Sequence, residues 1–333
     1  MKSILKKYWF VCLLALLFLG VSVFYIIDTN KDVVKGKKSN GEDVVYSIDD
    51  QNVTVSEYYN TLYENSGTNA ARMLFERHLV SQAFETTPEL EEKAKTQAEE
   101  IRTNFQYQYG ASATEQLDSI LKSMGYDGEK DLEAYVVDAL KQDQLIDEYG
   151  DAHFDELQIR DVSYILIQHE NPSEDTSKPT EAMQEKMDAV DAALASGREF
   201  ADVATEFSED QSTAPTGGDL GLLDNKVTTL DAAFLEGSLA LKENEVSDWV
   251  HSDQFGYFKL KNNASTKESV KAWINANLAE GEEEKNVYYE LANSFDPEIY
   301  SRAISEKAKE LGIDYMGNTD LEEAFKEAYG LGE

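Results

Sequence analysis

The sequence predicts an α+β protein with a discontinuous helical domain, an α/β domain inserted into it, and an N-terminal transmembrane helix before both. Three observations support this fold class. An uncharged apolar run follows lysines at the N-terminus, and hydrophobic residues recur with a helical period over most of the remaining chain. The period changes to a strand pattern only between about residues 159 and 263.

The composition excludes several classes of protein. Among 333 residues, 30 are Lys or Arg and 65 are Asp or Glu, so the formal net charge is −35. Such a polyanion repels phosphate backbones, and we expect no nucleic-acid partner. The single cysteine, Cys12, excludes an intramolecular disulfide and a cysteine-based metal site, and the four histidines lack the spacing of a metal site. We therefore expect no metal and no cofactor.

The N-terminal segment is predicted to anchor the protein in a membrane. Residues 1–7 carry three lysines and are expected to remain cytoplasmic, whereas residues 8–27 are uncharged and are followed by Asp28. As a helix, this run is long enough to cross a hydrocarbon core of ~30 Å. The sequence thus predicts a single-pass signal anchor in the cell membrane, with the C-terminal domains extracytoplasmic.

Two other interpretations of the same segment stay open. A cleaved signal peptide would use Gly20 and Ser22 as the small residues before the cut. A lipoprotein signal would use Cys12, although the residues before it are too bulky for a lipobox. The apolar run continues to Ile27, past the candidate cut, which favours the anchor. An exported chain without further cysteines is typical of a Gram-positive-type envelope.

The first helical part follows a polar, lysine-rich linker at residues 28–42. Residues 43–158 are predicted to be mainly helical, after a short β-prone stretch at 44–48. Thr87 with proline next to it predicts a helix start, because proline at the first helical position loses no hydrogen bond. The sequence at 112–115 resembles a capping box at the start of another helix.

The inserted domain is predicted at residues 159–263. It contains, in order, a β-branched strand at 162–167, a polar loop at 170–180, two helices at 183–194 and 200–207, and a glycine-rich turn at 217–221. More helix follows the turn and leads to a closing strand at 255–260. Helical spacing returns in residues 264–333, which have no clear core of their own. We expect these C-terminal helices to pack on the first helical part.

The order of motifs in the inserted domain resembles the parvulin-type peptidyl-prolyl isomerases. The stretches that carry the resemblance are 163–167, 197–204, 207–210, 217–221, 245–247 and 255–257. The flanking helices are similar to those of exported foldases of the PrsA and SurA type, so that the likeness covers most of residues 43–320. The likeness implies a helical chaperone domain that binds unfolded or newly exported proteins and a domain that isomerises Xaa-Pro bonds. It is also compatible with a homodimer.

The resemblance also implies how the site works. Rotation about an Xaa-Pro bond meets a barrier of ~20 kcal/mol set by amide resonance, and no covalent step is needed. The site has to hold the proline ring in an apolar pocket and favour the twisted amide. The resemblance assigns substrate binding to Leu220, Leu230, Phe234 and Phe258. Leu230 stands where the family usually has methionine.

The polar centre departs from the family pattern. Tyr164 and Phe258 occupy the positions of the two family histidines, whereas Asp210 keeps the acidic position. We expect Asp210 and Tyr164 to be the catalytic pair, with Asp210 accepting a hydrogen bond from Tyr164 or from a nearby hydroxyl such as Ser252. Isomerase activity is therefore expected to be weak. The alternative is a non-catalytic holdase with a degenerate parvulin domain.

Two further expectations concern the surroundings of this site. His251 is expected in a solvated loop, although it could fold back toward the site as a substitute imidazole. The loop at 170–180 is acidic where phosphate-directed parvulins carry basic residues, so we expect no recognition of phosphorylated Ser-Pro or Thr-Pro.

Overall fold

The computed structural model describes most of the chain beyond the N-terminal segment. The described residues are 37–49, 51–169, 177–276, 278 and 284–331. The predicted transmembrane helix at 8–27 lies outside them, as do residues 1–7 and most of the linker. None of the helices in the described ranges has the length and apolarity needed to cross a bilayer. The chain divides into two compact units, Met1–Ala70 and Ala71–Glu333.

The first unit contains a small antiparallel sheet followed by helix. Its elements are β1 (Lys38–Ser39), β2 (Glu42–Ile48), β3 (Gln51–Thr54), α2 (Val55–Leu62) and a π-helical turn, η1 (Tyr63–Gly67). Strand β2 confirms the β-prone stretch expected at 44–48. Helix α2 begins at Thr54, whose hydroxyl accepts the N–H of Glu57 at 3.2 Å.

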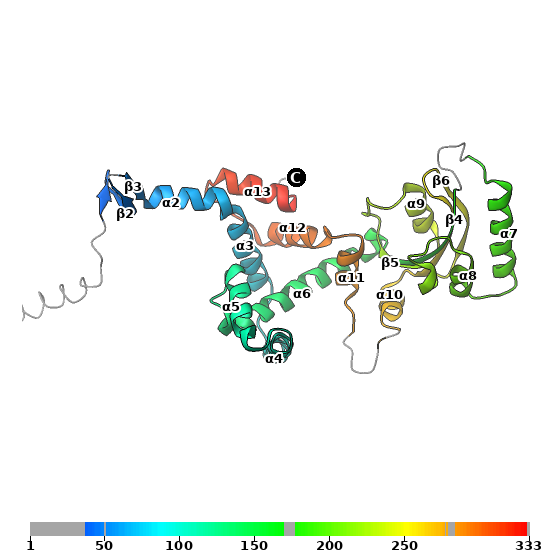
Figure 1. Cartoon of the computed structure of the whole chain (residues 1–333), viewed down its shortest axis with the longest axis horizontal. Helices are drawn as coiled ribbons and strands as arrows, with labels where there is room; N and C mark the ends of the chain where they lie inside the picture. Colours follow the sequence, from blue (N-terminus) through cyan, green and yellow to red (C-terminus); the bar gives the residue numbers. More distant parts are fainter. Residues whose placement is uncertain (1–36, 50, 170–176, 277, 279–283, 332–333) are drawn as a thin grey trace, which may run out of the picture. The chain divides into compact units, whose positions relative to one another are not determined.

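The second unit contains two groups of helices, one on each side of a sheet in the sequence (Figure 1). The first group is α3 (Thr68–Ala83, of which the first three residues belong to the first unit), α4 (Pro88–Tyr109), α5 (Ala113–Ser123) and α6 (Leu132–Leu157). The second group is α10 (Lys267–Ile274), α11 (Val287–Ser294), α12 (Ile299–Leu311) and α13 (Thr319–Tyr329). Short 3-10 turns, η2 (Gly110–Ser112) and η3 (Glu129–Asp131), precede α5 and α6.

The helix starts agree in part with the capping motifs in the sequence. The Thr87 hydroxyl accepts the N–H of Leu90 at 3.2 Å at the start of α4, as predicted. The capping box expected at 112–115 is wrong, because the chain enters α5 through a 3-10 turn. The Ser112 hydroxyl donates to the Tyr109 carbonyl at 3.0 Å instead of capping the helix.

The two groups of helices share a hydrophobic core. Helices α12 and α13 pack against α3 and α6 through the buried residues Leu79, Val80, Leu145, Ala303, Ile304, Ala308, Phe325 and Tyr329. The Tyr329 hydroxyl also accepts from Arg72 at 3.3 Å and donates to Glu76. The C-terminal helices therefore bury their apolar faces against helices that lie more than 150 residues earlier in the chain.

The inserted domain is a four-stranded antiparallel sheet with helices on both faces. The strands are β4 (Arg160–Gln168), β5 (Asp219–Leu223), β6 (Val246–Ser252) and β7 (Gly256–Ala264), in the order β5-β4-β7-β6. Three helices cover it: α7 (Glu181–Ala195), α8 (Phe200–Phe207) and α9 (Ala232–Ala240). A further 3-10 turn, η4 (Ala214–Thr216), precedes β5.

The sequence predicted only two of these four strands. Strand β5 occupies the predicted glycine-rich turn, and β6 occupies a segment interpreted as loop. Gly218 explains the first difference: its φ is +79°, and a Cβ there would overlap the carbonyl oxygen of Tyr164. The Tyr164 N–H donates to the Gly218 carbonyl at 2.9 Å, so the glycines bring the edge strand into contact with β4.

The central strand β4 is buried on both faces, and its alternation separates two cores. Val162, Tyr164 and Leu166 point to the face covered by α9, whereas Ile165 and Ile167 point to the face covered by α7 and α8. The two faces bury different groups of side chains. The α9 face also contains the residues that the sequence assigned to the site.

Arg160 joins helix α9 to the start of β4. Its side chain is buried, and one guanidinium nitrogen donates to the carbonyls of Ser238, Leu239 and Leu241 at 2.8, 3.0 and 3.1 Å. These carbonyls lie at the end of α9, where the helix dipole is negative. Burial lowers the pKa of Arg160, so the carbonyls take the place of a carboxylate partner.

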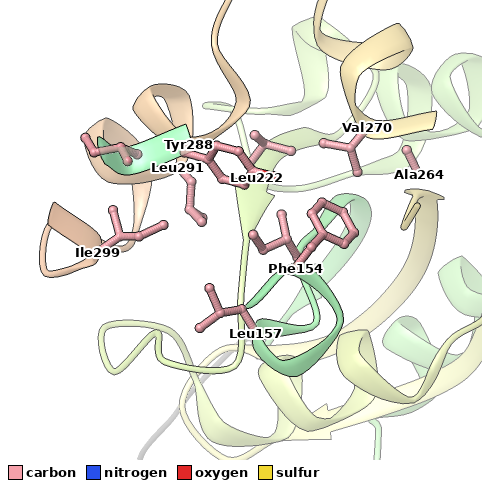
Figure 2. Packing of buried hydrophobic residues seen from close by; sticks show 10 residues of the cluster. Phe154, Leu157, Leu222, Ala264, Val270, Tyr288, Leu291 and Ile299 are labelled. Carbon is pink, nitrogen blue, oxygen red and sulfur yellow. The ribbon is translucent and has the colours of Figure 1, made fainter. Parts of the chain in front are cut away.

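A second core joins the inserted sheet to the helices (Figure 2). Phe154 and Leu157 of α6 meet Leu222 of edge strand β5, while Tyr288 and Leu291 come from α11. Val270 of α10, Ala264 at the end of β7 and Ile299 of α12 complete the labelled group. Helical segments before and after the inserted domain therefore contact the same edge of its sheet.

Two carboxyl groups lie next to this core, on a cavity of about 400 Å³. Asp161 is 2% exposed and accepts a hydrogen bond from Asn263 at 2.8 Å. Burial and the neighbouring Asp219 carboxyl raise the pKa of Asp161 to about 7, and burial also raises the pKa of Asp219. Lys285 and Glu290 line the same cavity.

The Asp161 carboxyl predicts a pH dependence of stability. Its pKa is about 7 in the folded protein and 3.8 in a model peptide, so the folded state binds more protons between about pH 4 and pH 7. Stability should therefore fall as the pH rises through this window. In Asp161→Asn, the melting temperature should be higher than in the wild type at pH 8 and similar at pH 4, as measured by circular dichroism.

The matched control is Glu185→Gln, which removes a charge from an exposed position on α7. Its difference in melting temperature from the wild type should be small at both pH values. If the melting temperatures of wild type and Asp161→Asn change with pH in parallel, the Asp161 carboxyl does not bind the proton that the folded state gains in this window.

A second prediction concerns Arg160. Arg160→Met should lower the free energy of unfolding by about 2–4 kcal/mol, because three buried or partly buried carbonyls lose a charged donor. The control Arg198→Met removes an ion pair between half-exposed side chains, Arg198 and Glu206, and should cost at most about 1 kcal/mol. Urea denaturation measures both values. Equal losses would contradict the role assigned to Arg160.

Candidate functional site

The candidate site is a cavity of about 260 Å³ on the α9 face of the sheet. Its lining residues are Tyr164, Leu166, Gln168, Asp210, Leu220, Thr229, Leu230, Asp231, Phe234, Phe255 and Phe258. All six residues that the sequence assigned to catalysis or substrate binding are in this set. They come from two central strands, the edge strand, one helix and two loops, so only the folded chain brings them together.

Three aromatic rings form the apolar wall of the cavity. The ring of Phe234 lies 5.3 Å from that of Tyr164 and 5.0 Å from that of Phe258, with interplanar angles of 87° and 81°. The Tyr164 and Phe258 rings are 5.8 Å apart at 74°. These edge-to-face contacts suit the charge distribution of aromatic rings and hold each ring in one orientation.

Helix α9 positions Phe234 through its N-cap. The Asp231 carboxylate accepts the N–H of Phe234 at 3.0 Å, and its other oxygen accepts the Ser252 hydroxyl at 2.8 Å. Ser252 was considered as a donor to Asp210, but its hydroxyl is used by Asp231. The Ser252 oxygen also accepts the N–H of Phe255 at 3.2 Å, which links the turn after β6 to the start of α9.

Tyr164 and Asp210 form the polar wall. The Tyr164 hydroxyl donates to Asp210 Oδ2, which also accepts the Thr213 hydroxyl at 2.9 Å. The Ser212 N–H and hydroxyl donate to Oδ1 at 3.0 and 2.7 Å. Burial, together with the Asp210 hydrogen bond, raises the pKa of Tyr164 to about 12. Tyrosine therefore keeps its proton as a donor throughout the physiological pH range.

The ionisation of Asp210 reflects two opposing effects. Partial burial favours the neutral acid, but hydrogen bonds from Tyr164, Ser212 and Thr213 outweigh it, and the pKa of Asp210 is below its usual value. The site therefore contains an ionised carboxylate and a neutral phenol at neutral pH. Because the carboxylate accepts four hydrogen bonds, it is held in one position.

The loop that carries Asp210 is attached to β4. The Glu209 N–H donates to the Leu166 carbonyl at 2.8 Å, and the Leu166 N–H donates to the Ser208 hydroxyl at 3.2 Å. Lys186 of α7 forms an ion pair with Glu209. The strand that supplies Tyr164 thus also fixes the loop that supplies its partner.

His251 lies outside the cavity. The sequence placed it in a loop, but it is a residue of β6, and its ring packs 4.9 Å from Tyr257 and 5.7 Å from His169. It therefore does not replace either imidazole. Among the described residues, no group of three or more His, Cys, Asp or Glu side chains could hold a metal ion.

Sequence reasoning missed five residues that line the cavity: Leu166, Gln168, Thr229, Asp231 and Phe255. Leu166 follows Tyr164 by two residues on a predicted strand, so the strand period alone places it on the same face. Asp231 stands three residues before Phe234, which is the spacing of an N-cap. No comparable signal identifies the other three.

A comparison with protein families matches residues 153–266 to the PPIC-type PPIase domain. The foldase protein PrsA of Geobacillus kaustophilus is 23% identical over 290 residues, covering 87% of this chain and 92% of that protein. PrsA of Halalkalibacterium halodurans is 29% identical over 234 residues, covering 66% of this chain and 64% of that protein.

Solved structures of related proteins are also similar. The crystal structure of PrsA from Bacillus cereus covers 89% of this chain and all of its own chain (100%), with 20% identity and a TM-score of 0.43. The solution structure of the parvulin of Nitrosopumilus maritimus covers 32% of this chain and 97% of its own chain, with 25% identity and a TM-score of 0.25.

The family match therefore covers the whole four-stranded sheet and its three helices, including every residue of the cavity. The PrsA likeness extends beyond it into the helices on both sides. Residues 153–266 thus match the parvulin-type peptidyl-prolyl cis–trans isomerase family, and the chain is similar over most of its length to the PrsA foldases.

Proposed function

We propose that this isomerase is a membrane-anchored extracytoplasmic foldase that binds unfolded or newly exported proteins and isomerises their Xaa-Pro bonds in the cavity of the sheet domain. The observation that carries the proposal is the convergence of Leu220, Leu230, Phe234 and Phe258 on one small apolar cavity beside the Tyr164–Asp210 pair. The apolar run at residues 8–27 supports the membrane anchor.

The cavity can lower the rotation barrier without covalent chemistry. The planar amide owes its stiffness to charge separation between oxygen and nitrogen, and this separation is lost in the twisted state. Phe234 and Phe258, which are 3% and 5% exposed, surround the proline ring with apolar atoms, and such surroundings favour the less polar twisted amide. In this mechanism Tyr164 and Asp210 hold one wall in place and exchange no proton with the substrate.

The alternative function is that of a holdase that binds prolyl segments without catalysis. The cavity lining supports this alternative because it contains no imidazole, and Phe258 offers no hydrogen bond at the position of a family histidine. Losing one such polar stabiliser can cost about 10²-fold in rate. Exchange spectroscopy on an Ala-Pro peptide separates the two functions, because only an isomerase accelerates cis–trans exchange.

The proposed mechanism predicts that apolar contacts matter more than the polar pair. Phe234→Ala should abolish exchange and prolyl-peptide binding, and truncation of a buried Phe also costs ~3–5 kcal/mol of stability. Tyr164→Phe keeps the ring but removes the donor, and should retain exchange within about ten-fold. NMR exchange spectroscopy measures both rates.

Phe234→Leu is the matched variant for stability, since it keeps an apolar side chain and should fold. It should reduce exchange by an amount between those of the other two variants. If Tyr164→Phe is as damaging as Phe234→Ala in a folded protein, polar chemistry rather than apolar burial drives the reaction.

We further propose that residues 43–158 and 264–333 form one chaperone domain, with 159–263 as the inserted isomerase domain. The shared core of α3, α6, α12 and α13 supports this division. The ends of the inserted domain also lie side by side, because Asp161 and Ala264 are cross-strand partners of β4 and β7. A short linker can therefore replace the inserted domain without stretching the helices apart.

This division predicts that the helical part acts alone. A protein in which a glycine-serine linker replaces 159–263 should unfold cooperatively and suppress aggregation of an unfolded client, measured by light scattering. It should be less stable than the full chain, because Ile159 and Leu222 are lost from the second core, which joins the sheet to the helices. Loss of folding in this protein would count against a discontinuous chaperone domain.

A further inference from the structure

The rim of the cavity is acidic, and no cation lies on it. Asp210 and Asp231 are the charged residues in the lining, and none of the described lining residues is Lys, Arg or His. Lys186 of α7 forms an ion pair with Glu209, the residue before Asp210. Within the described residues, the carboxylates of Asp210 and Asp231 accept hydrogen bonds from uncharged backbone N–H groups and hydroxyls, such as those of Ser212 and Ser252.

The charge on this rim is not cancelled by the helix beneath it. Asp231 caps α9, whose N-terminal dipole is equivalent to about half a positive charge. The two negative charges of Asp210 and Asp231 exceed this half positive charge, so the rim remains negative. The hydrogen bonds that lower the pKa of Asp210 keep its carboxylate ionised at neutral pH.

When a prolyl segment is bound with its proline in the cavity, the residues next to that proline must lie over this rim. The cavity holds about 260 Å³, enough for a proline ring and little more. The residue before proline has its Cα only ~3.8 Å along the chain, so its side chain is within reach of the rim carboxylates. In the partly solvated rim, one unit charge at such a distance changes affinity by about three- to ten-fold.

We propose that Asp231, together with Asp210, determines the substrate preference of this isomerase by selecting Xaa-Pro bonds in which Xaa is Lys or Arg and rejecting those in which Xaa is Asp or Glu. This inference rests on the proposed function of the cavity and defines its substrate class. Asp231 acts twice in this arrangement: its N-cap bond orients Phe234, and its charge faces the bound chain.

The test uses full-length protein in a neutral detergent and three peptides, Ala-Lys-Pro-Phe, Ala-Leu-Pro-Phe and Ala-Glu-Pro-Phe. Exchange spectroscopy yields kcat/KM for each, and chemical-shift titration yields each Kd. We expect kcat/KM and affinity to decrease in the order Lys, Leu, Glu. The Lys peptide should be preferred over the Glu peptide by about ten-fold at low salt. The ratio should approach about two near 1 M salt, where screening is strong.

Asp231→Asn removes the charge but keeps an N-cap acceptor for Phe234. It should lower the preference for the Lys peptide over the Glu peptide to about three-fold, both in kcat/KM and in affinity (1/Kd). The matched control is Glu199→Gln at the N-cap position of α8. The Glu199 side chain makes no cap hydrogen bond and is not part of the cavity lining. This control should leave the ratio unchanged, although it also removes one charge from the domain.

Equal turnover and equal affinity for the Lys and Glu peptides would overturn the proposal. A ratio that falls as much in Glu199→Gln as in Asp231→Asn would also overturn it, because the preference would then come from the net charge of −35. If no peptide exchanges faster than in buffer, the isomerase function fails instead, and the Kd values alone still decide whether the rim selects cations.

Discussion

Burial of strand β4 on both faces is the constraint on which the rest of the structure depends. Every residue from Arg160 to Ile167 is buried, so each one needs a partner on its own side of the sheet. Tyr164 and Leu166 find theirs under α9, and Ile165 and Ile167 find theirs under α7 and α8. The aromatic wall, the Asp210 loop and the edge strand are all fixed by contacts to this strand.

Buried polar groups on the same strand connect it to the remaining elements. Arg160 points to the end of α9, whereas Asp161 points to the cavity beside α10 and α11. The hydrogen bonds of each group compensate for only part of the free-energy cost of burying it. The lowered pKa of Arg160 and the raised pKa of Asp161 indicate this cost. These two residues cost stability but fix the position of β4 against its neighbours. Two apolar side chains in their place would form no directed hydrogen bonds and would allow β4 to shift.

Sequence reasoning predicted a mixed fold of helices and one inserted sheet, and the six residues that it proposed for the site lie on one cavity. It missed two strands, one beginning beside a glycine pair and one at the edge of the sheet. Strand β4 has a strong β-branched pattern. Strand β5 begins beside Gly218, and glycine in a sequence predicts a turn because it readily adopts the positive φ that this residue has. Strand β6 mixes polar and aromatic residues at a sheet edge, so His251 looked like a loop residue. The site residues were found through the order of family motifs. Their aromatic packing and the use of Ser252 by Asp231 depend on distances across strands, which periodicity does not contain.

Neighbouring residues of β5 face different parts of the molecule. Leu220 lines the candidate site cavity, Asp219 lines the cavity beside α10 and α11, and Leu222 belongs to the core shared with α6. The isomerase domain thus packs on the helices through a strand of its own sheet. A client bound by the helices while its proline lies in the cavity would therefore contact two surfaces that share one buried core.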